Sequence, residues 1–234
     1  IKNEQKNKKE YDLTNYIVIT EYLENGDVFS VTKDYLQSKG SKKEKMNPTI
    51  RSKIIFGVAA TMKQLHNRNV LHRNLTNSNV FLDNRLEPRI GTFTFAKFLA
   101  KSFEIVSVGT LEFFAPEVFT KDETYSFPAD VYAFAMFVYF MFSFEYRFPD
   151  KKPIRYESKY LESISRGKRF IRPENISDPY WELVQSCWKQ DPSERPTFQD
   201  ITNILKDDKF AIEEFGMKTN LDELHEYQKR IDID

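Results

Sequence analysis

The chain has 234 residues, of which 40% are hydrophobic and 30% charged, and these proportions exclude a globally disordered protein. Lys and Arg together number 35, as do Asp and Glu, so the zero net charge gives no support to nucleic acid or an anionic membrane as a partner. The single cysteine, Cys187, excludes an internal disulfide framework, argues against a thiolate metal site and fits a reducing compartment.

The first residues predict a polar segment followed by a strand. IKNEQKNKKEYD has no apolar run of the kind found in a secretory signal, which together with the single cysteine predicts a cytoplasmic protein. Residues 16–23, YIVITEYL, are β-branched and aromatic, and they end at the turn-like ENGD. This pattern predicts a buried strand that ends in a turn.

A long helix is predicted next. Asn47 and Pro48 are typical of a helix start, with Asn as the N-cap and Pro at the first helical position. Over about five turns, apolar residues then recur at three- and four-residue steps, which predicts an amphipathic helix. The residues in this pattern are Ile54, Ile55, Val58, Ala59, Met62, Leu65 and His66.

The segment after this helix, VLHRNLTNSNVFLD over residues 70–83, concentrates polar side chains between two apolar flanks. It has a His, an Arg, three Asn and two hydroxyls, but no acidic residue before Asp83. This composition is typical of an active-site loop, although the carboxylate that could act as a general base is missing. NVFLD and EPRIGTF then form two short apolar segments with a turn-like NRLE between them.

The rest of the chain is predicted to be helical. Residues 131–144 are the most apolar run, and their 14 residues are fewer than the roughly 18 that a membrane helix needs, so we expect a buried central helix and no membrane insertion. Trp181, Val184 and Cys187 have helical spacing within residues 178–190. Thr197, with Asp200 three residues on, predicts a capping box at the start of another helix.

A final helix is predicted to begin after Asn220, which stands in the same relation to Glu223. Its apolar stripe consists of Leu221, Leu224, Tyr227 and Ile231. The stripe predicts a helix that either packs on the domain or leads into a further region. The expected fold class is mostly α with a small β component.

This order of motifs resembles the C-terminal lobe of a protein kinase. HRNLTNSN, residues 72–79, resembles the catalytic loop, and TFT, residues 92–94, holds the positions of the Asp-Phe-Gly triplet. GTLEFFAPE carries an intact Ala-Pro-Glu, and its GT resembles the serine/threonine-type substrate loop. YSFPADVYAFA resembles the start of the family's buried central helix, and CWKQDPSERPTF is similar to the closing motif of tyrosine-kinase-like kinases.

The resemblance implies a protein-kinase-like fold made of the C-lobe plus the hinge, with YIVITEYLENG as the strand and hinge over the nucleotide. Most of the N-lobe is expected to be absent, because no Gly-rich phosphate loop and no VAIK-like stretch occurs in the sequence. We therefore expect a partial kinase-like domain over residues 1–210, followed by a C-terminal helical extension over residues 211–234.

Several residues at the family's chemical positions are changed. Asn74 holds the position of the catalytic Asp, and its amide has no useful basicity near pH 7. Thr92 holds the position of the metal-binding Asp, and a neutral hydroxyl is a poor ligand for Mg²⁺. Thr76 stands where serine/threonine kinases carry a Lys, and only Asn79, at the second metal-ligand position, is retained.

The nucleotide positions implied by the resemblance are Glu21 and Leu23, which align with the hinge residues that hold adenine. By family, the cofactors would be ATP and Mg²⁺, while the missing carboxylates argue against both in this chain. For Arg73 two roles remain open, a receptor for a phosphate in the loop before Ala-Pro-Glu and a structural arginine.

The residues that brace the family's large lobe are present. His72 and Phe93 match positions that stack in the core. Asp130 matches a buried carboxylate that holds the catalytic loop by its backbone, and Glu117 and Arg195 match a buried ion pair. Structural residues are therefore retained where catalytic residues are lost.

This contrast predicts a pseudokinase, a binding or scaffolding module in signalling whose protein partners use the substrate-side groove and the helices past Phe148. The alternative is an active ATP-dependent serine/threonine kinase of the tyrosine-kinase-like group, of which this sequence is a part. A weaker third option is a sensor that binds nucleotide without transferring phosphate. No sequence feature favours a particular oligomeric state.

Overall fold

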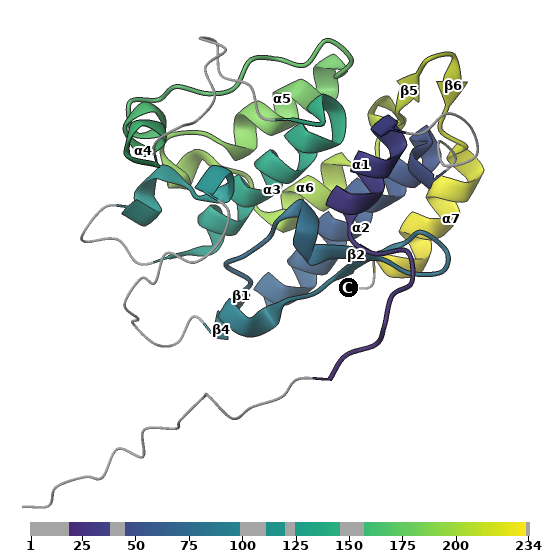
Figure 1. Ribbon diagram of the computed structural model, residues 1–234, viewed down its shortest axis with the longest axis horizontal. Helices are drawn as coiled ribbons and strands as arrows, with labels where there is room; N and C mark the ends of the chain where they lie inside the picture. The colour runs from purple at the N-terminus through teal and green to yellow at the C-terminus, as the bar shows by residue number, and fades with distance from the viewer. Residues whose placement is uncertain (1–18, 38–44, 99–110, 120–124, 146–156, 233–234) are drawn as a thin grey trace, which may run out of the picture.

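The computed structural model describes residues 19–37, 45–98, 111–119, 125–145 and 157–232 (Figure 1). Helices predominate in these ranges, and the strands form three two-stranded antiparallel sheets. The expected fold class, mostly α with a small β component, is confirmed for the part of the chain that is described.

Helix α2, Pro48–Asn67, begins as the sequence predicts. The Asn47 side chain accepts a hydrogen bond from the backbone N–H of Ile50 at 3.0 Å, and Pro48 lies in the first turn, where no intrahelical N–H is needed. The prediction of an amphipathic helix is wrong in one respect. The polar residues Arg51, Ser52 and Lys53 are buried as well, because two later helices, α6 (Phe198–Ile204) and α7 (Leu221–Ile231), cover the face of α2 that the sequence predicted to be exposed.

Helix α3, Phe127–Ser143, is the predicted central helix, and every side chain from Ala129 to Phe142 is buried. It ends where Phe144 adopts a left-handed conformation, and the Phe144 N–H donates to the Phe140 carbonyl at 2.9 Å. α3 packs against α2 and α5, and the hydrophobic core lies around it (Figure 1). Among the described helices, none has the length and apolar character required to cross a bilayer.

The two short apolar segments after the polar loop form a hairpin. Strand β2, Val80–Leu82, pairs with β3, Pro88–Ile90, so that Val80 lies opposite Ile90 and Leu82 opposite Pro88. A second sheet joins β1, Val70–Leu71, to β4, Lys97–Phe98. The polar loop, residues 72–79, therefore connects β1 of one small sheet to β2 of the other.

The strand predicted over residues 16–23 is not found in its described part. Residues 19–23 have no regular secondary structure, with Ile19 91% and Tyr22 85% exposed, while residues 16–18 lie outside the described ranges. A strand needs a partner for its backbone groups, and among the described residues pairing begins only at Asp27, which bridges to Phe81 of β2. Helix α1, Val28–Gln37, follows directly and was not predicted.

Two of the later helices begin at their predicted caps, Thr197 and Asn220. The later helices are α4, Glu157–Ser165; α5, Asp178–Cys187; α6, Phe198–Ile204; and α7, Leu221–Ile231. Thr197 and Asp200 form the predicted capping box of α6, and Asn220 accepts from the Glu223 N–H at the start of α7. Between α6 and α7 lies a third sheet of β5, Glu213–Glu214, and β6, Met217–Lys218.

Helix α7 packs along α2, on the side away from α4 (Figure 1). Leu224 and Tyr227 of the predicted stripe are buried, and Ile231 packs against the core. Of the two alternatives for this helix, packing on the domain is the one that the structure shows.

Candidate functional site

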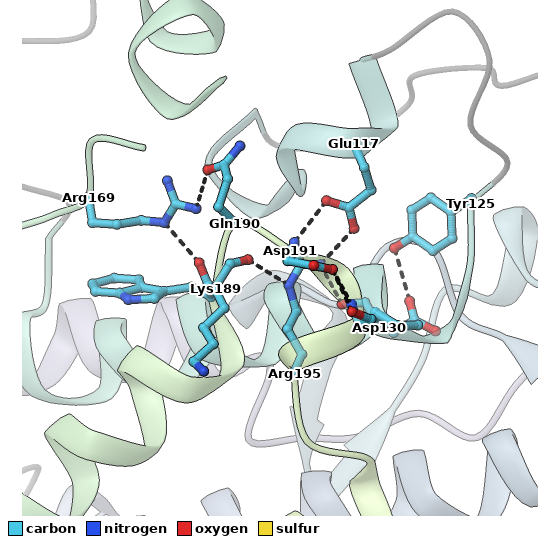
Figure 2. Close-up of polar contacts among 11 residues, drawn as sticks. Glu117, Tyr125, Asp130, Arg169, Lys189, Gln190, Asp191 and Arg195 are labelled. Atoms are coloured by element: carbon cyan, nitrogen blue, oxygen red, sulfur yellow. Dashed lines mark hydrogen bonds and ion pairs between the residues drawn. The ribbon is translucent and has the colours of Figure 1, made fainter. Parts of the chain in front are cut away.

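The carboxylate of Asp130, at the start of α3, holds the polar loop by its backbone. Its two oxygens accept the N–H groups of His72 and Arg73, each at 2.9 Å. They also accept from the Tyr125 hydroxyl and contact His66 Nε2, each at 3.0 Å; Figure 2 shows the tyrosine contact. Asp130 is fully buried, and the role predicted for it in bracing the loop matches these contacts.

Burial by itself would raise the pKa of Asp130. The hydrogen bond from His66, the two nearby imidazoles and the Arg73 amide outweigh burial and hold the Asp130 pKa below its usual value. The carboxylate therefore remains charged and continues to accept these donors well below neutral pH.

His72 connects the polar loop to the segment that carries Thr92. Its Nε2 contacts the Gly91 carbonyl oxygen at 3.0 Å, while the Gly91 N–H donates to the Asn79 carbonyl at 2.9 Å. Gly91 sits so close to the hairpin that a Cβ on it would lie 2.8 Å from the Phe81 ring. These contacts place Thr92 next to the loop that contains Asn74 and Asn79.

Burial lowers the pKa of His72 below its usual value, although Asp130 acts in the opposite direction. With Nε2 donating to Gly91, the buried Nδ1 has no hydrogen-bond partner in the described part of the chain. A second proton would therefore place an unsatisfied charged donor in the interior.

We expect the free energy of unfolding to fall as the pH is lowered from about 6.5, the pKa of an unfolded histidine, toward the lower pKa of folded His72. In that window only the unfolded chain takes up the proton, with a slope of at most about 1.4 kcal/mol per pH unit. Denaturant unfolding at several pH values measures the slope. His72→Phe should remove it, whereas His225→Gln, at an exposed histidine, should keep it. An unchanged slope in His72→Phe would refute the assignment.

Asn74 and Asn79 are joined by one hydrogen bond. The Asn79 Nδ2 donates to the Asn74 carbonyl oxygen at 2.8 Å, and the Asn79 N–H donates to the Thr76 carbonyl at 3.0 Å. The three predicted loop residues therefore lie together. This bond uses one of the two N–H donors of the Asn79 amide, and its side-chain oxygen is the atom that it can offer to a metal ion.

Asp83, the acidic residue at the far end of the loop motif, is committed to the β2–β3 turn. Its Oδ1 accepts the N–H groups of Arg85 and Glu87 at 2.9 and 3.0 Å, and its Oδ2 accepts from Arg89 at 2.9 Å. Burial would raise the Asp83 pKa, but these hydrogen bonds lower it. Asp83 therefore does not replace the missing catalytic carboxylate.

Thr92 has a left-handed backbone conformation, with φ 60° and ψ 53°. A β-branched residue is disfavoured there by about 1–2 kcal/mol, whereas Asn and Asp tolerate the conformation. The backbone at this position thus suits an aspartate better than the threonine that occupies it.

Thr92→Asn is expected to raise the free energy of unfolding by about 1 kcal/mol, because it removes the backbone strain without adding charge. Thr94→Asn is the matched control, since Thr94 lies two residues on in the 3-10 turn Phe93–Phe95 and has no positive φ. Urea unfolding of the two variants measures the difference. Equal stabilities of the two variants would contradict the strain at Thr92.

Phe93 only partly fulfils its prediction. Its ring meets the His72 ring edge to face, with centroids 5.2 Å apart, as the stacking prediction requires. Phe93 is nevertheless 46% exposed, so its expected place in the core is wrong.

Glu117 and Arg195 form the predicted buried ion pair (Figure 2). The guanidinium donates to both carboxylate oxygens, at 2.6 and 2.8 Å, and also to the Lys189 and Pro128 carbonyls, each at 2.9 Å. The two side chains are 7% and 0% exposed. The pair therefore joins the Ala-Pro-Glu segment to the segment that leads into α6.

Arg73 contacts an aromatic ring: its guanidinium lies 5.4 Å from the centroid of the Tyr125 ring. Together with the Asp130 bond to its backbone, this contact favours the structural role. The loop before Ala-Pro-Glu has three hydroxyl residues that could carry such a phosphate, Ser102, Ser107 and Thr110, and all three lie outside the described residues.

Glu21 and Leu23, predicted to hold adenine, lie in the segment before α1, and this role stays a prediction. Glu21 is exposed and forms no hydrogen bond or ion pair within the described ranges, and the Leu23 carbonyl closes a turn with Gly26 at 3.1 Å. The turn is attached to the hairpin, because the Leu82 N–H donates to the Gly26 carbonyl at 2.9 Å. The predicted hinge thus adjoins β2, on the same hairpin that bears the loop.

The oxygens near the predicted metal position do not fit Mg²⁺. Asn79 offers an amide oxygen and Thr92 a hydroxyl, whereas Mg²⁺ in proteins is held through carboxylates and phosphates. In the described ranges no cluster of three or more His, Cys, Asp or Glu could hold a metal ion.

Sequence reasoning missed several residues that support the site. Tyr125 and His66 complete the contacts of Asp130, and Arg51 pairs with Glu214 across 163 positions of the chain. The sequence contains no signal for this pairing, because Arg51 stands beside Ser52 and Lys53 on what looked like the polar face of the helix.

Comparison with known proteins agrees with this geometry. Residues 7–208 match the protein kinase domain family. The chain is 32% identical over 199 residues to a probable serine/threonine-protein kinase of Dictyostelium discoideum, covering 83% of this chain and 14% of that protein. It is 30% identical over 203 residues to the human cytoplasmic tyrosine-protein kinase BMX, covering 85% and 28%. The Arabidopsis thaliana serine/threonine-protein kinase CTR1 is 26% identical over 197 residues.

A mostly helical fold built around α3, with its polar loop braced by a buried carboxylate, is consistent with a protein kinase fold. The chain belongs to the protein kinase domain family. Its similar proteins include both serine/threonine and tyrosine kinases, and it spans only 14–28% of the length of the relatives described above.

Proposed function

We propose that this chain is a pseudokinase domain, which acts in the cytoplasm as a binding or scaffolding module for protein partners in signalling. The observation that carries the proposal is the chemistry of the loop: Asn74, Asn79 and Thr92 lie together and are all neutral, whereas Asp130 and Glu117 are in place. Phosphoryl transfer depends on positioning and on carboxylate-bound Mg²⁺, and this set of side chains supplies no carboxylate.

Two further observations support the proposal. The left-handed backbone at Thr92 suits the aspartate that the family carries there, which is consistent with loss of the carboxylate from a retained scaffold. Asp83, the nearest acidic residue of the loop motif, is occupied by the hairpin turn. A substitute general base is therefore not provided by the motif itself.

The test is a phosphate-transfer assay on the longest natural form of the protein, with ATP, Mg²⁺ and protein substrates. The proposal predicts transfer indistinguishable from that of a buffer control. Turnover within about tenfold of 1 s⁻¹, the lower end for protein kinases, would overturn it.

A second candidate function is an active serine/threonine kinase with an unusual metal site. One observation favours it: the Asn79 side chain is held against the loop by the Asn74 carbonyl, so the retained metal-ligand position is ordered. An asparagine at position 74 can also hydrogen-bond a substrate hydroxyl, although loss of a general base typically costs a factor on the order of 10²–10⁴.

The variant Asn74→Asp/Thr92→Asp distinguishes the two candidates. If the remaining parts of an active site are intact, restoring both carboxylates should raise the rate by at least about 100-fold. A rise of that size from a measurable wild-type rate favours the active kinase. No rise, with a thermal midpoint that is not lowered, favours the scaffolding module.

A further inference from the structure

The described chain continues beyond residue 208, where the family match ends, through the β5–β6 hairpin and α7. We propose that α7 is a clamp: it fixes the turn of the β2–β3 hairpin, and through this hairpin it positions the hinge, Asn79 and Thr92 of the candidate site. This positioning role does not depend on whether the site holds a nucleotide or a protein.

The segment that carries α7 is anchored on α2 by buried charges. Arg51 pairs with Glu214, and the two side chains are 0% and 7% exposed. One turn from the end of the same helix, Lys63 Nζ lies 2.5 Å from Asp232 Oδ1, with exposures of 2% and 6%. Since a buried charge that loses its partner is strongly destabilising, these pairs hold both ends of the segment in place.

The helix also contacts the hairpin turn directly. Arg230 of α7 pairs with Glu87, which is 6% exposed and donates its own N–H to Asp83 within the turn at 3.0 Å. Nearby, a Cβ on Gly57 of α2 would lie 2.2 Å from the Tyr227 hydroxyl oxygen and 2.5 Å from Pro88 Cγ. α2, α7 and β3 therefore meet without space for even one added carbon.

The open end of the β2–β3 hairpin, opposite its turn, adjoins the candidate site. Asn79 immediately precedes β2, and Gly91 and Thr92 immediately follow β3. Two hydrogen bonds attach the hinge turn to the same hairpin: Leu82 N–H to the Gly26 carbonyl at 2.9 Å, and Asn25 Nδ2 to the Asp83 carbonyl at 2.8 Å. Movement of the turn would therefore move the hinge together with Asn79 and Thr92, the site residues that adjoin the two ends of the hairpin.

A charge-swap cycle tests the clamp in the longest natural form of the protein. The variants are Arg230→Glu, Glu87→Arg and their combination, with Arg230→Gln as a milder change should the reversal unfold the chain. Lys229→Glu is the matched control, because Lys229 is exposed and adjacent and undergoes the same change of charge. The readout is amide hydrogen exchange, which reports local opening and requires no nucleotide.

We expect exchange at the amides of Leu82 and Gly91 to accelerate by about tenfold in Arg230→Glu, the size of a modest local opening, and to return toward the wild-type rate in the double variant. The amides of His72 and Arg73, held by Asp130, should not change. Unchanged exchange at Leu82 and Gly91, or equal acceleration at His72 and Arg73, would overturn the clamp. Neither result depends on phosphate transfer, so this experiment tests the clamp independently of the proposed function.

Discussion

Arg195→Met is expected to lower the free energy of unfolding by about 3–5 kcal/mol, because it leaves the carboxylate of Glu117 charged, buried and without its bidentate partner. The substitution also removes the donors that satisfy the Lys189 and Pro128 carbonyls. Equilibrium unfolding in urea, followed by circular dichroism, measures the change.

Two comparisons make this result specific. The double variant Glu117→Met/Arg195→Met should be more stable than Arg195→Met alone, because no charge is then stranded. Lys189→Met breaks a surface ion pair with Glu194, in which the charged atoms are 3.4 Å apart and the side chains are 46% and 56% exposed. This variant should lower the free energy of unfolding by less than about 1 kcal/mol. If Arg195→Met cost no more than Lys189→Met, the buried pair would not support the lobe.

Glu214→Ala should destabilise the protein by a similar amount, about 3–5 kcal/mol, although residue 214 lies beyond the family match. Arg51 is 0% exposed, and without Glu214 the contacts of its guanidinium with described residues would be the bond to the Met141 carbonyl at 2.5 Å and the nearby Phe142 and Phe144 rings, none of which carries a negative charge. Thermal and urea unfolding measure the loss.

The neighbouring residue provides the control. Glu213 pairs with Lys218 at 3.2 Å on the surface, with 59% and 73% of the side chains exposed, so Glu213→Ala should change stability by less than about 1 kcal/mol. A domain boundary at residue 210 stays a prediction. If Glu214→Ala were as mild as Glu213→Ala, residues 211–234 would behave as a separable extension.

Much of the fold could be predicted because its signals are local. The caps Asn47, Thr197 and Asn220 each begin a helix where their side chains suggested, since capping depends on residues only three positions apart. The burial of α3 followed from an apolar run with no polar face.

The errors arose where distant residues decide the structure. Residues 19–23 have the composition of a strand, but a strand forms only with a partner, and Ile19 and Tyr22 are exposed. The buried face of α2 depends on Glu214 and Asp232, more than 160 positions away, and composition does not report such pairings.

At the candidate site, the sequence identified the residues and their missing charges but not their conformation. The left-handed backbone at Thr92 runs against the preference of threonine, so only the structure could show it. The same holds for Asn79, whose side chain is turned toward the Asn74 carbonyl.

The contrast between retained bracing carboxylates and lost metal-binding ones is tested most directly by the Mg²⁺ dependence of ATP binding. Thermal unfolding of the longest natural protein would be measured with ATP, with and without Mg²⁺, for the wild type and for Thr92→Asp. The account predicts that Mg²⁺ adds no stabilisation by ATP to the wild type and adds some to the variant. A wild-type protein that ATP stabilises several degrees further when Mg²⁺ is present would contradict it.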